Sequence, residues 1–139
     1  MSESPLRAFL DAMDALDVEA AISLFAPVPS FTTAFGEEAV GAEQVQAVIR
    51  ELFSELRGAH HDVSSEWNPQ PGVWIVEMTA TYELTDFSER GPYKRLVIAV
   101  TGEDGIRQIR VYGAHELPLP EEGRAYREVR GPHGWLPTL

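Results

Sequence analysis

The chain has 139 residues, of which 44% are hydrophobic, as expected for one globular domain with one core. It contains no cysteine, which excludes disulfides and thiolate metal sites, and its formal net charge of −11 argues against binding to nucleic acid or to an anionic membrane surface. No run approaches the ~18 apolar residues of a membrane span, and the acidic, periodic N-terminus does not resemble a signal peptide, so we expect a cytoplasmic protein whose acidity serves solubility or an acidic recognition patch.

Two short helices are predicted at the start of the chain. Ser4 is a suitable N-cap and Pro5 a suitable first helical residue. The apolar residues that follow recur at the spacing of one helical face: Leu6, Phe9, Leu10, Met13 and Leu16. Asp17 is the predicted N-cap of a second helix, which Pro27 and Pro29 would end.

A strand, a turn and the strongest helix of the chain are predicted next. The strand covers residues 30–35 with Phe31, Thr33 and Phe35 on one face, and residues 36–41 form the turn. A wide apolar stripe then predicts the helix: Val45, Val48, Ile49, Leu52, Phe53 and Leu56. Gly58 has the position of a residue that ends a helix.

Four long strands with period-two patterns are predicted after this helix. In the strand 60–67 the apolar side holds His61, Val63, Ser65 and Trp67. In the strand 72–84, expected to be central, the core face holds Trp74, Val76, Met78, Ala80, Tyr82 and Leu84. In the strand 93–101 the core face is predicted to hold Leu96, Ile98 and Val100, and in the strand 106–115 Ile109, Val111, Gly113 and His115. Residues 103–105 form the turn between the last two strands.

The order of these elements predicts an α+β domain over residues 1–117, with three helices packed on one face of a curved, mainly antiparallel sheet. Residues 118–139 are rich in Pro and Gly and form an extension. We expect its Trp135 and Leu136 to pack on the domain, since a solvated tail has no use for them.

At this level the chain resembles the nuclear transport factor two-like superfamily. Members include ketosteroid isomerases, scytalone dehydratases, limonene epoxide hydrolases and SnoaL-like polyketide cyclases. Three segments carry the resemblance: LRAFLDAMDALD with AAISLF, FGEEAVGAEQVQAVIRELFSEL, and EDGIRQIRVYGAHE. The resemblance implies a cone-shaped fold with a deep apolar pocket between the sheet and the helices, and dimerisation through the outer face of the sheet.

The resemblance makes the inward aromatic, methionine and threonine residues candidates for binding a ligand in that pocket. They are Phe9, Met13, Phe31, Thr33, Phe35, Trp74 and Met78. Such residues also serve simply as core packing. His61 and His115 are either partly exposed residues at the sheet margin or, with the Tyr82 hydroxyl, a catalytic acid–base set. No HxH or HxxxH pattern indicates a metal site, and no Gly-rich loop indicates a phosphate-bearing cofactor.

The catalytic carboxylates of the enzymes in this superfamily have no counterparts here. Ketosteroid isomerase-like members carry an Asp before the third helix, where this chain has residues 32–35, TTAF. Many SnoaL-like members carry an acidic residue after the aromatic of the last strand, where Tyr112 is followed by Gly113. The Arg and two Asp residues of epoxide hydrolases have no inward match, since Glu77 faces outward and Asp86 lies in a loop.

Two functions therefore stay open. The chain is a small-molecule-binding SnoaL-like domain, or a cofactor-independent isomerase, dehydratase or cyclase that uses His61, Tyr82 or His115. In either case we expect a small, largely apolar ligand, neutral or cationic, such as a polyketide- or terpenoid-like compound, since no inward Lys or Arg cluster is evident. A homodimer is predicted through an outer sheet face with these residues: Ile75, Thr79, Thr81, Val97, Ala99 and Tyr112.

Overall fold

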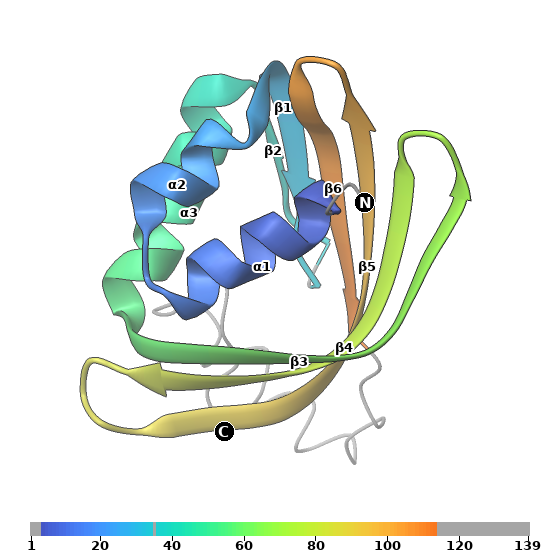
Figure 1. Cartoon of the computed structure of the whole chain (residues 1–139). Coiled ribbons are helices and arrows are strands. Elements are labelled where there is room, and N and C mark those ends of the chain that lie inside the picture. Colours follow the sequence, from blue (N-terminus) through green and yellow to red (C-terminus); the bar gives the residue numbers. More distant parts are fainter. Residues whose placement is uncertain (1–3, 35, 114–139) are drawn as a thin grey trace.

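In the computed structural model, which describes residues 4–34 and 36–113, three helices lie on one face of a single curved six-stranded sheet (Figure 1). The strand order is β2-β1-β6-β5-β4-β3. The predicted α+β architecture is confirmed. Phe35, His115, the domain boundary at residue 117 and the extension 118–139 lie outside the described residues.

The helices are α1 (Pro5–Asp14), α2 (Val18–Ser23) and α3 (Ala42–Glu55). Both predicted N-caps are confirmed, because the Ser4 hydroxyl accepts a hydrogen bond from the Arg7 amide at 3.3 Å and the Asp17 carboxylate accepts one from the Ala20 amide at 3.1 Å. Leu16, at φ 55°, reverses the chain between α1 and α2.

The strands are β1 (Phe25–Thr32), β2 (Glu38–Val40), β3 (Leu56–Gln70), β4 (Val73–Leu84), β5 (Glu89–Gly102) and β6 (Gly105–Gly113). All neighbours pair antiparallel except β1 and β6, which are parallel. The turn before β6 is confirmed. Gly72 in the β3–β4 turn has φ 82°, and a Cβ there would lie 2.7 Å from the Thr101 carbonyl oxygen, so the turn requires glycine.

The first strand differs from its prediction in position. It begins at Phe25 and contains Pro27 and Pro29, which were expected only to end the second helix. Both prolines fall between Phe25 and Ser30, where the register of β1 against β6 shifts. Proline has no N–H to donate to a ladder, so it is tolerated at such an irregularity. The short edge strand β2 was not predicted.

The strand β3 was predicted too short at both ends. Helix α3 ends at Glu55 and the chain enters β3 directly, so Gly58 lies within a strand and does not end the helix. A register irregularity between Val63 and Ser65 moves the following side chains to the other face. Trp67, predicted to face inward, is therefore paired with Ile75 and 48% exposed.

The inner face of β4 is confirmed, because Val76, Met78, Ala80 and Leu84 are buried. However, β4 is second from the sheet edge and not central. The predicted register of β5 is wrong: Val97 and Ala99 lie in the core, whereas Ile98 is only partly buried.

The error in β5 has a physical reason. Both faces of this strand are apolar, and the predicted face holds the larger aliphatic side chains, Leu96, Ile98 and Val100. Pairing with β4 places Val97 beside Val76 and Ile98 beside Ile75. Paired residues share a face, so the face of β5 that pairs with the buried residues of β4 is its inner face. Arg95 therefore faces inward with Val97.

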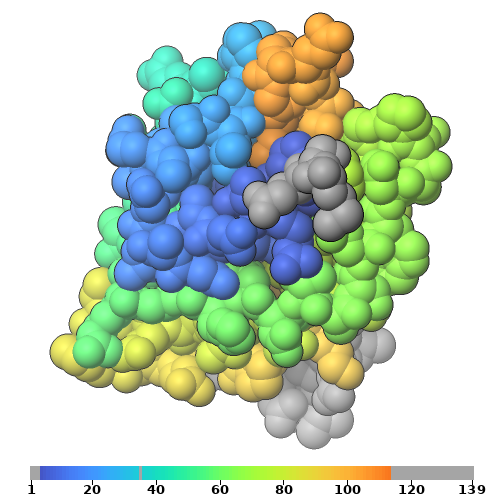
Figure 2. Space-filling model, in the orientation of Figure 1, coloured from blue at the N-terminus to red at the C-terminus, as the bar shows by residue number. Residues whose placement is uncertain are grey.

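The core lies between α1, α3 and the inner face of the sheet. Helix α1 contributes Leu6, Phe9, Leu10 and Met13, all buried, and it lies along β3 on the face seen in Figure 2. Helix α3 contributes Val45, Ile49 and Leu52, while Val48 and, on β6, Val111 pack against the core partly buried. Among the described residues, no helix has the length and apolarity needed to cross a membrane.

We expect Val97→Thr to lower the free energy of unfolding by about 1–3 kcal/mol, because it buries a hydroxyl on the core side of β5. The matched change Val100→Thr, on the outer face of the same strand, should cost about 0.5 kcal/mol or less. Urea denaturation of both variants checks the register, and the opposite ranking would contradict it.

Candidate functional site

A cavity of about 70 Å³ lies between the helices and the inner face of the sheet. It is mostly apolar, and its lining includes Leu6, Phe9, Leu10, Met13, Phe31, Thr33, Val48, Leu52, His61, Met78, Tyr82, Arg95, Val97, Ile109 and Val111. Seven predicted site residues are among these: Phe9, Met13, Phe31, Thr33, His61, Met78 and Tyr82. The eighth that the structure describes, Trp74, packs against the core without lining the cavity.

A second hollow, of about 300 Å³, lies beside α2, β1 and the start of α3. Although it is larger, none of the predicted site residues that the structure describes lines it, and among the described residues Asp104 is its only ionisable lining residue. The smaller cavity is therefore the candidate site, because it brings ionisable and hydrogen-bonding groups together with an apolar wall.

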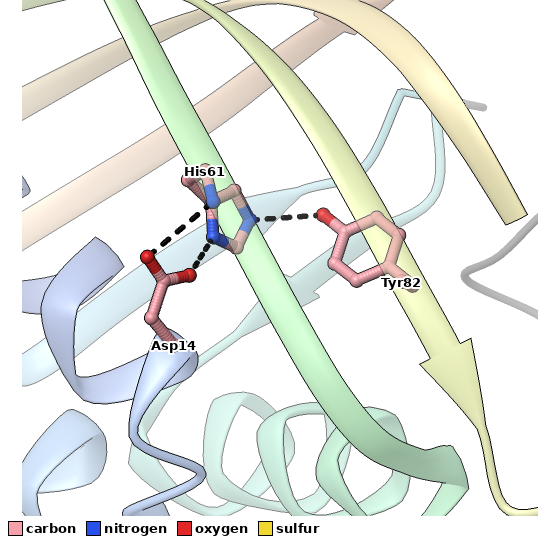
Figure 3. Close-up of polar contacts among 3 residues, drawn as sticks. All are labelled: Asp14, His61 and Tyr82. Atoms are coloured by element: carbon pink, nitrogen blue, oxygen red, sulfur yellow. Dashed lines mark hydrogen bonds and ion pairs between the residues drawn. The ribbon is translucent and has the colours of Figure 1, made fainter. Parts of the chain in front are cut away.

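His61 lines the cavity, and a carboxylate from helix α1 holds it in place (Figure 3). Its Nδ1 lies 2.6 Å from the Asp14 Oδ1, and its backbone amide donates to the Asp14 Oδ2 at 3.3 Å. The His61 side chain is 1% exposed, whereas that of Asp14 is 30% exposed. The ring orientation is thus fixed by Asp14, which itself keeps contact with solvent.

On its other side, His61 meets Tyr82. The Nε2 lies 3.1 Å from the Tyr82 hydroxyl oxygen, and the two rings meet edge to face at 5.5 Å. The sheet register creates this contact: His61 pairs with Ala80, and Tyr82 is the next residue of β4 on the same face. Such diagonal neighbours on adjacent strands are within reach of aromatic side chains.

The hydrogen-bond directions follow from the charge of Asp14. Its ionised carboxylate only accepts, so the Nδ1 of His61 carries a proton and donates. In neutral His61 the Nε2 then accepts from the Tyr82 hydroxyl; in the imidazolium it donates to the Tyr82 oxygen. Burial raises the pKa of Tyr82, an effect that the positive charge of Arg95 opposes and the Asp14 carboxylate reinforces. Tyr82 is therefore a neutral hydroxyl at physiological pH.

Further polar side chains follow Tyr82 on the neighbouring strand β5. The rings of Tyr82 and Tyr93 lie 6.4 Å apart, and the Arg95 guanidinium lies over the face of the Tyr93 ring, 4.7 Å from its centroid. Arg95 is 8% exposed and its Nη1 donates to the Lys94 carbonyl at 3.0 Å. Asp14, His61, Tyr82, Tyr93 and Arg95 thus follow one another, and we call these five residues the polar wall. Three of them, His61, Tyr82 and Arg95, line the cavity itself.

Two members of the polar wall with full charges, Asp14 and Arg95, were missed in the sequence. Asp14 was detectable, because it follows Leu6 and Leu10 at steps of four residues, and side chains at i and i+4 share a helix face. Arg95 was not detectable, because its inward direction depends on the register of β5. The hydrogen-bonding partner of His61 that the sequence did not reveal is thus the carboxylate of Asp14, 47 residues earlier in the chain.

The two carboxylates that the sequence placed outside the pocket lie as expected. Glu77 is exposed on the outer face of β4, and Asp86 lies in the turn after it. His60, the neighbour of His61, is exposed. Within residues 4–34 and 36–113, no three His, Asp or Glu side chains come together in a group that could hold a metal ion.

Comparison with known proteins finds no matching family model and no matching curated sequence. Solved structures do match. A protein of unknown function from an Exiguobacterium species, described as NTF2-like, shares 20% identity at a TM-score of 0.67 over 79% of this chain and 98% of its own. The chain has the nuclear transport factor two-like fold.

Other proteins of this fold match as well as that one. A Shewanella denitrificans protein described as a SnoaL-like polyketide cyclase is 6% identical, with a TM-score of 0.69 over 78% of this chain and 87% of its own. A Catenulispora acidiphila protein with a ketosteroid isomerase-like fold, solved with trimethylamine, is 14% identical, with a TM-score of 0.68 over 81% and 86%. At these low identities, the similarity to nuclear transport factor two-like proteins shows the fold alone, and this fold hosts many different chemistries.

The raised pKa of Tyr82 predicts a loss of stability at high pH. Above pH 10, the ordinary pKa of tyrosine, the unfolded chain loses this proton while the folded chain keeps it, so the free energy of unfolding falls as pH rises. In Tyr82→Phe, we expect the free energy of unfolding to decrease less steeply than in the wild type between about pH 9 and pH 11, as measured by urea denaturation. A slope that Tyr82→Phe leaves unchanged would contradict the assignment.

Proposed function

We propose that this protein binds a small, largely apolar molecule in the cavity between its helices and sheet. The observation that supports this most is the composition of the lining, in which aromatic, aliphatic and methionine side chains surround one row of hydrogen-bonding groups. Binding sites for small molecules combine these two features, with the apolar wall giving affinity and the few polar groups fixing orientation.

The size of the cavity limits the ligand. A protein cavity of about 150 Å³ takes up benzene, and this cavity measures about 70 Å³. We therefore propose a ligand of only a few carbon atoms in the cavity itself. This is smaller than the polyketide- or terpenoid-like compound expected from the sequence.

A second candidate function, acid–base catalysis without a cofactor, is favoured by the contacts of His61. A buried imidazole held by a carboxylate on one nitrogen and a tyrosine on the other has the two groups that proton transfer at carbon needs, a base and a hydrogen-bond donor. The fold resemblance suggests an isomerase, dehydratase or cyclase, and each of these reactions includes a proton transfer.

The step we propose is enolisation of a carbonyl ligand. The Tyr82 hydroxyl turns from His61 to the ligand carbonyl oxygen, and the Nε2 of His61 takes a proton from the adjacent carbon. The C–H bonding pair becomes the C=C bond of an enolate, whose oxygen accepts from Tyr82. The imidazolium formed is stabilised by the Asp14 carboxylate, which acts as a positioning residue, and the proton then returns to carbon.

Binding can be followed with ¹³C-methyl-labelled methionine, because two of the three methionines, Met13 and Met78, line the cavity. We expect small ketones such as butanone to shift both signals. If catalysis occurs, hydrogen–deuterium exchange at the carbon next to the carbonyl should exceed the buffer rate. His61→Ala should then lower this excess about 10²–10⁴-fold, the usual contribution of a general base.

His60→Ala is the matched control, since it removes an exposed imidazole one residue away on the other face. Ligand shifts without exchange, or exchange that His61→Ala leaves unchanged, would exclude catalysis by His61 and keep binding. If no small ketone shifts the signal of Met13 or of Met78, the binding proposal is contradicted.

We also propose that the protein forms a homodimer through the outer face of its sheet. The apolar residues of this face differ from those predicted, because Val97 and Ala99 lie inside. Cross-strand pairs build the face instead: Ile75 with Ile98, Val73 with Val100, and Leu96 with Tyr112. A contiguous apolar sheet face of this kind is typical of protein–protein contacts.

Sedimentation velocity at micromolar concentration should give a species of twice the 15.4 kDa chain mass. Ile98→Glu should convert it to the monomer, because two-fold symmetry places each new charge in the interface twice. Val28→Glu, on an exposed residue of β1, is the control and should leave the mass unchanged. A monomeric wild-type protein would contradict the proposal.

A further inference from the structure

A positive charge, Arg110 of β6, lies within the apolar outer face of the sheet. It pairs with Ile98 of β5, which pairs in turn with Ile75 of β4. All three helices lie on the other face of the sheet (Figure 1). Arg110 is half-buried, and its Nε is fully buried without a hydrogen-bond partner among residues 4–34 and 36–113. Because a buried donor on a charged group is costly when it lacks an acceptor, this position favours an acceptor from another molecule.

The same face carries a carboxylate, that of Glu77 on β4. Glu77 is exposed and pairs with Leu96 of β5. Within the part of the chain that the structure describes, its side chain accepts one long hydrogen bond, from the Ser64 hydroxyl at 3.4 Å. A carboxylate has about four acceptor positions on its two oxygens, so Glu77 can accept further bonds from a molecule that covers this face.

The sheet register places the two charges symmetrically about the middle of the face. Strands β6 and β4 flank β5, and Arg110 lies opposite Ile98 while Glu77 lies opposite Leu96. The point midway between the two charges is therefore on β5, between Leu96 and Ile98. A two-fold axis through this point, perpendicular to the line that joins the charges, places the Arg110 of each copy over the Glu77 of the other. The aliphatic side chains of Leu96 and Ile98 then meet at the centre.

We propose that a second copy of this chain covers the outer face and that Arg110 of each copy binds the Glu77 carboxylate of the other. This inference rests on the proposed homodimer and adds the residues that fix the orientation of the two copies. An apolar face alone permits many arrangements, whereas two reciprocal charge pairs select one. The pairs also give the Arg110 Nε–H an acceptor, and the planar guanidinium can bind a carboxylate through two parallel hydrogen bonds.

Charge reversal tests this pairing, with the dissociation constant of the full-length dimer measured by analytical ultracentrifugation. Arg110→Glu brings two carboxylates together at each contact and Glu77→Arg two guanidinium groups, so each change alone should weaken the dimer at least about 30-fold. The double variant restores opposite charges and should regain most of the affinity. A mixture of the two single variants also matches both contacts, so it should form heterodimers at concentrations where each variant alone is monomeric.

The matched control is Arg7→Glu, which makes the same change of charge at an exposed residue of helix α1, on the other side of the sheet. It should leave the dissociation constant unchanged.

The outcomes separate the pairing from the homodimer itself. A monomeric wild-type protein would overturn both. A wild-type dimer that the single reversals leave intact, or that neither the double variant nor the mixture restores, would overturn the pairing and keep the homodimer. If circular dichroism shows that Arg110→Glu does not fold, Arg110→Gln replaces it. Glu77→Gln should then weaken the dimer in the wild type but not in the Arg110→Gln background, and equal effects in both would overturn the pairing.

Discussion

The pairing of β4 with its two neighbours is the constraint on which the rest of this protein depends. The β3 register places His61 one diagonal step from Tyr82, and the β5 register places Arg95 beside Met78. Because side chains alternate between faces, a slip of one residue in either pairing would move these groups to the outside. Core and polar wall are thus set by the same two ladders.

The polar wall has an energetic cost that its own contacts offset. A buried imidazole or guanidinium loses its hydration, and a polar group left without a partner in such a place costs about 1–3 kcal/mol. His61 meets Asp14 and Tyr82, and Arg95 meets the Lys94 carbonyl and the Tyr93 ring. Since Asp14 comes from α1 and the others from the sheet, the same contacts fix the helix over the cavity.

In the proposed function, the two layers of the site would recognise different properties of a ligand. The apolar lining, from α1, α3 and the inner strands, would select a ligand by size and shape, and a cavity of about 70 Å³ would admit only a small one. The polar groups would select it by charge and hydrogen bonding. This second selection would be the sharper one, because buried polar groups that a wrong ligand fails to pair remain unsatisfied. Proton transfer would require only these protein groups.

The sequence by itself determined the α+β architecture, both helix caps and the inner face of β4, because these depend on local periodicity and on side chains that bond their own backbone. Seven residues of the cavity, His61 and Tyr82 among them, follow from the same periodicity. Only the tertiary structure decided the faces of β5, the reversal at Trp67 and the pairing of Asp14 with His61. Strand β5 is apolar on both faces, so its pairing with β4 decides which face packs in the core. The contact between Asp14 and His61, 47 residues apart, exists only once α1 has packed on the sheet.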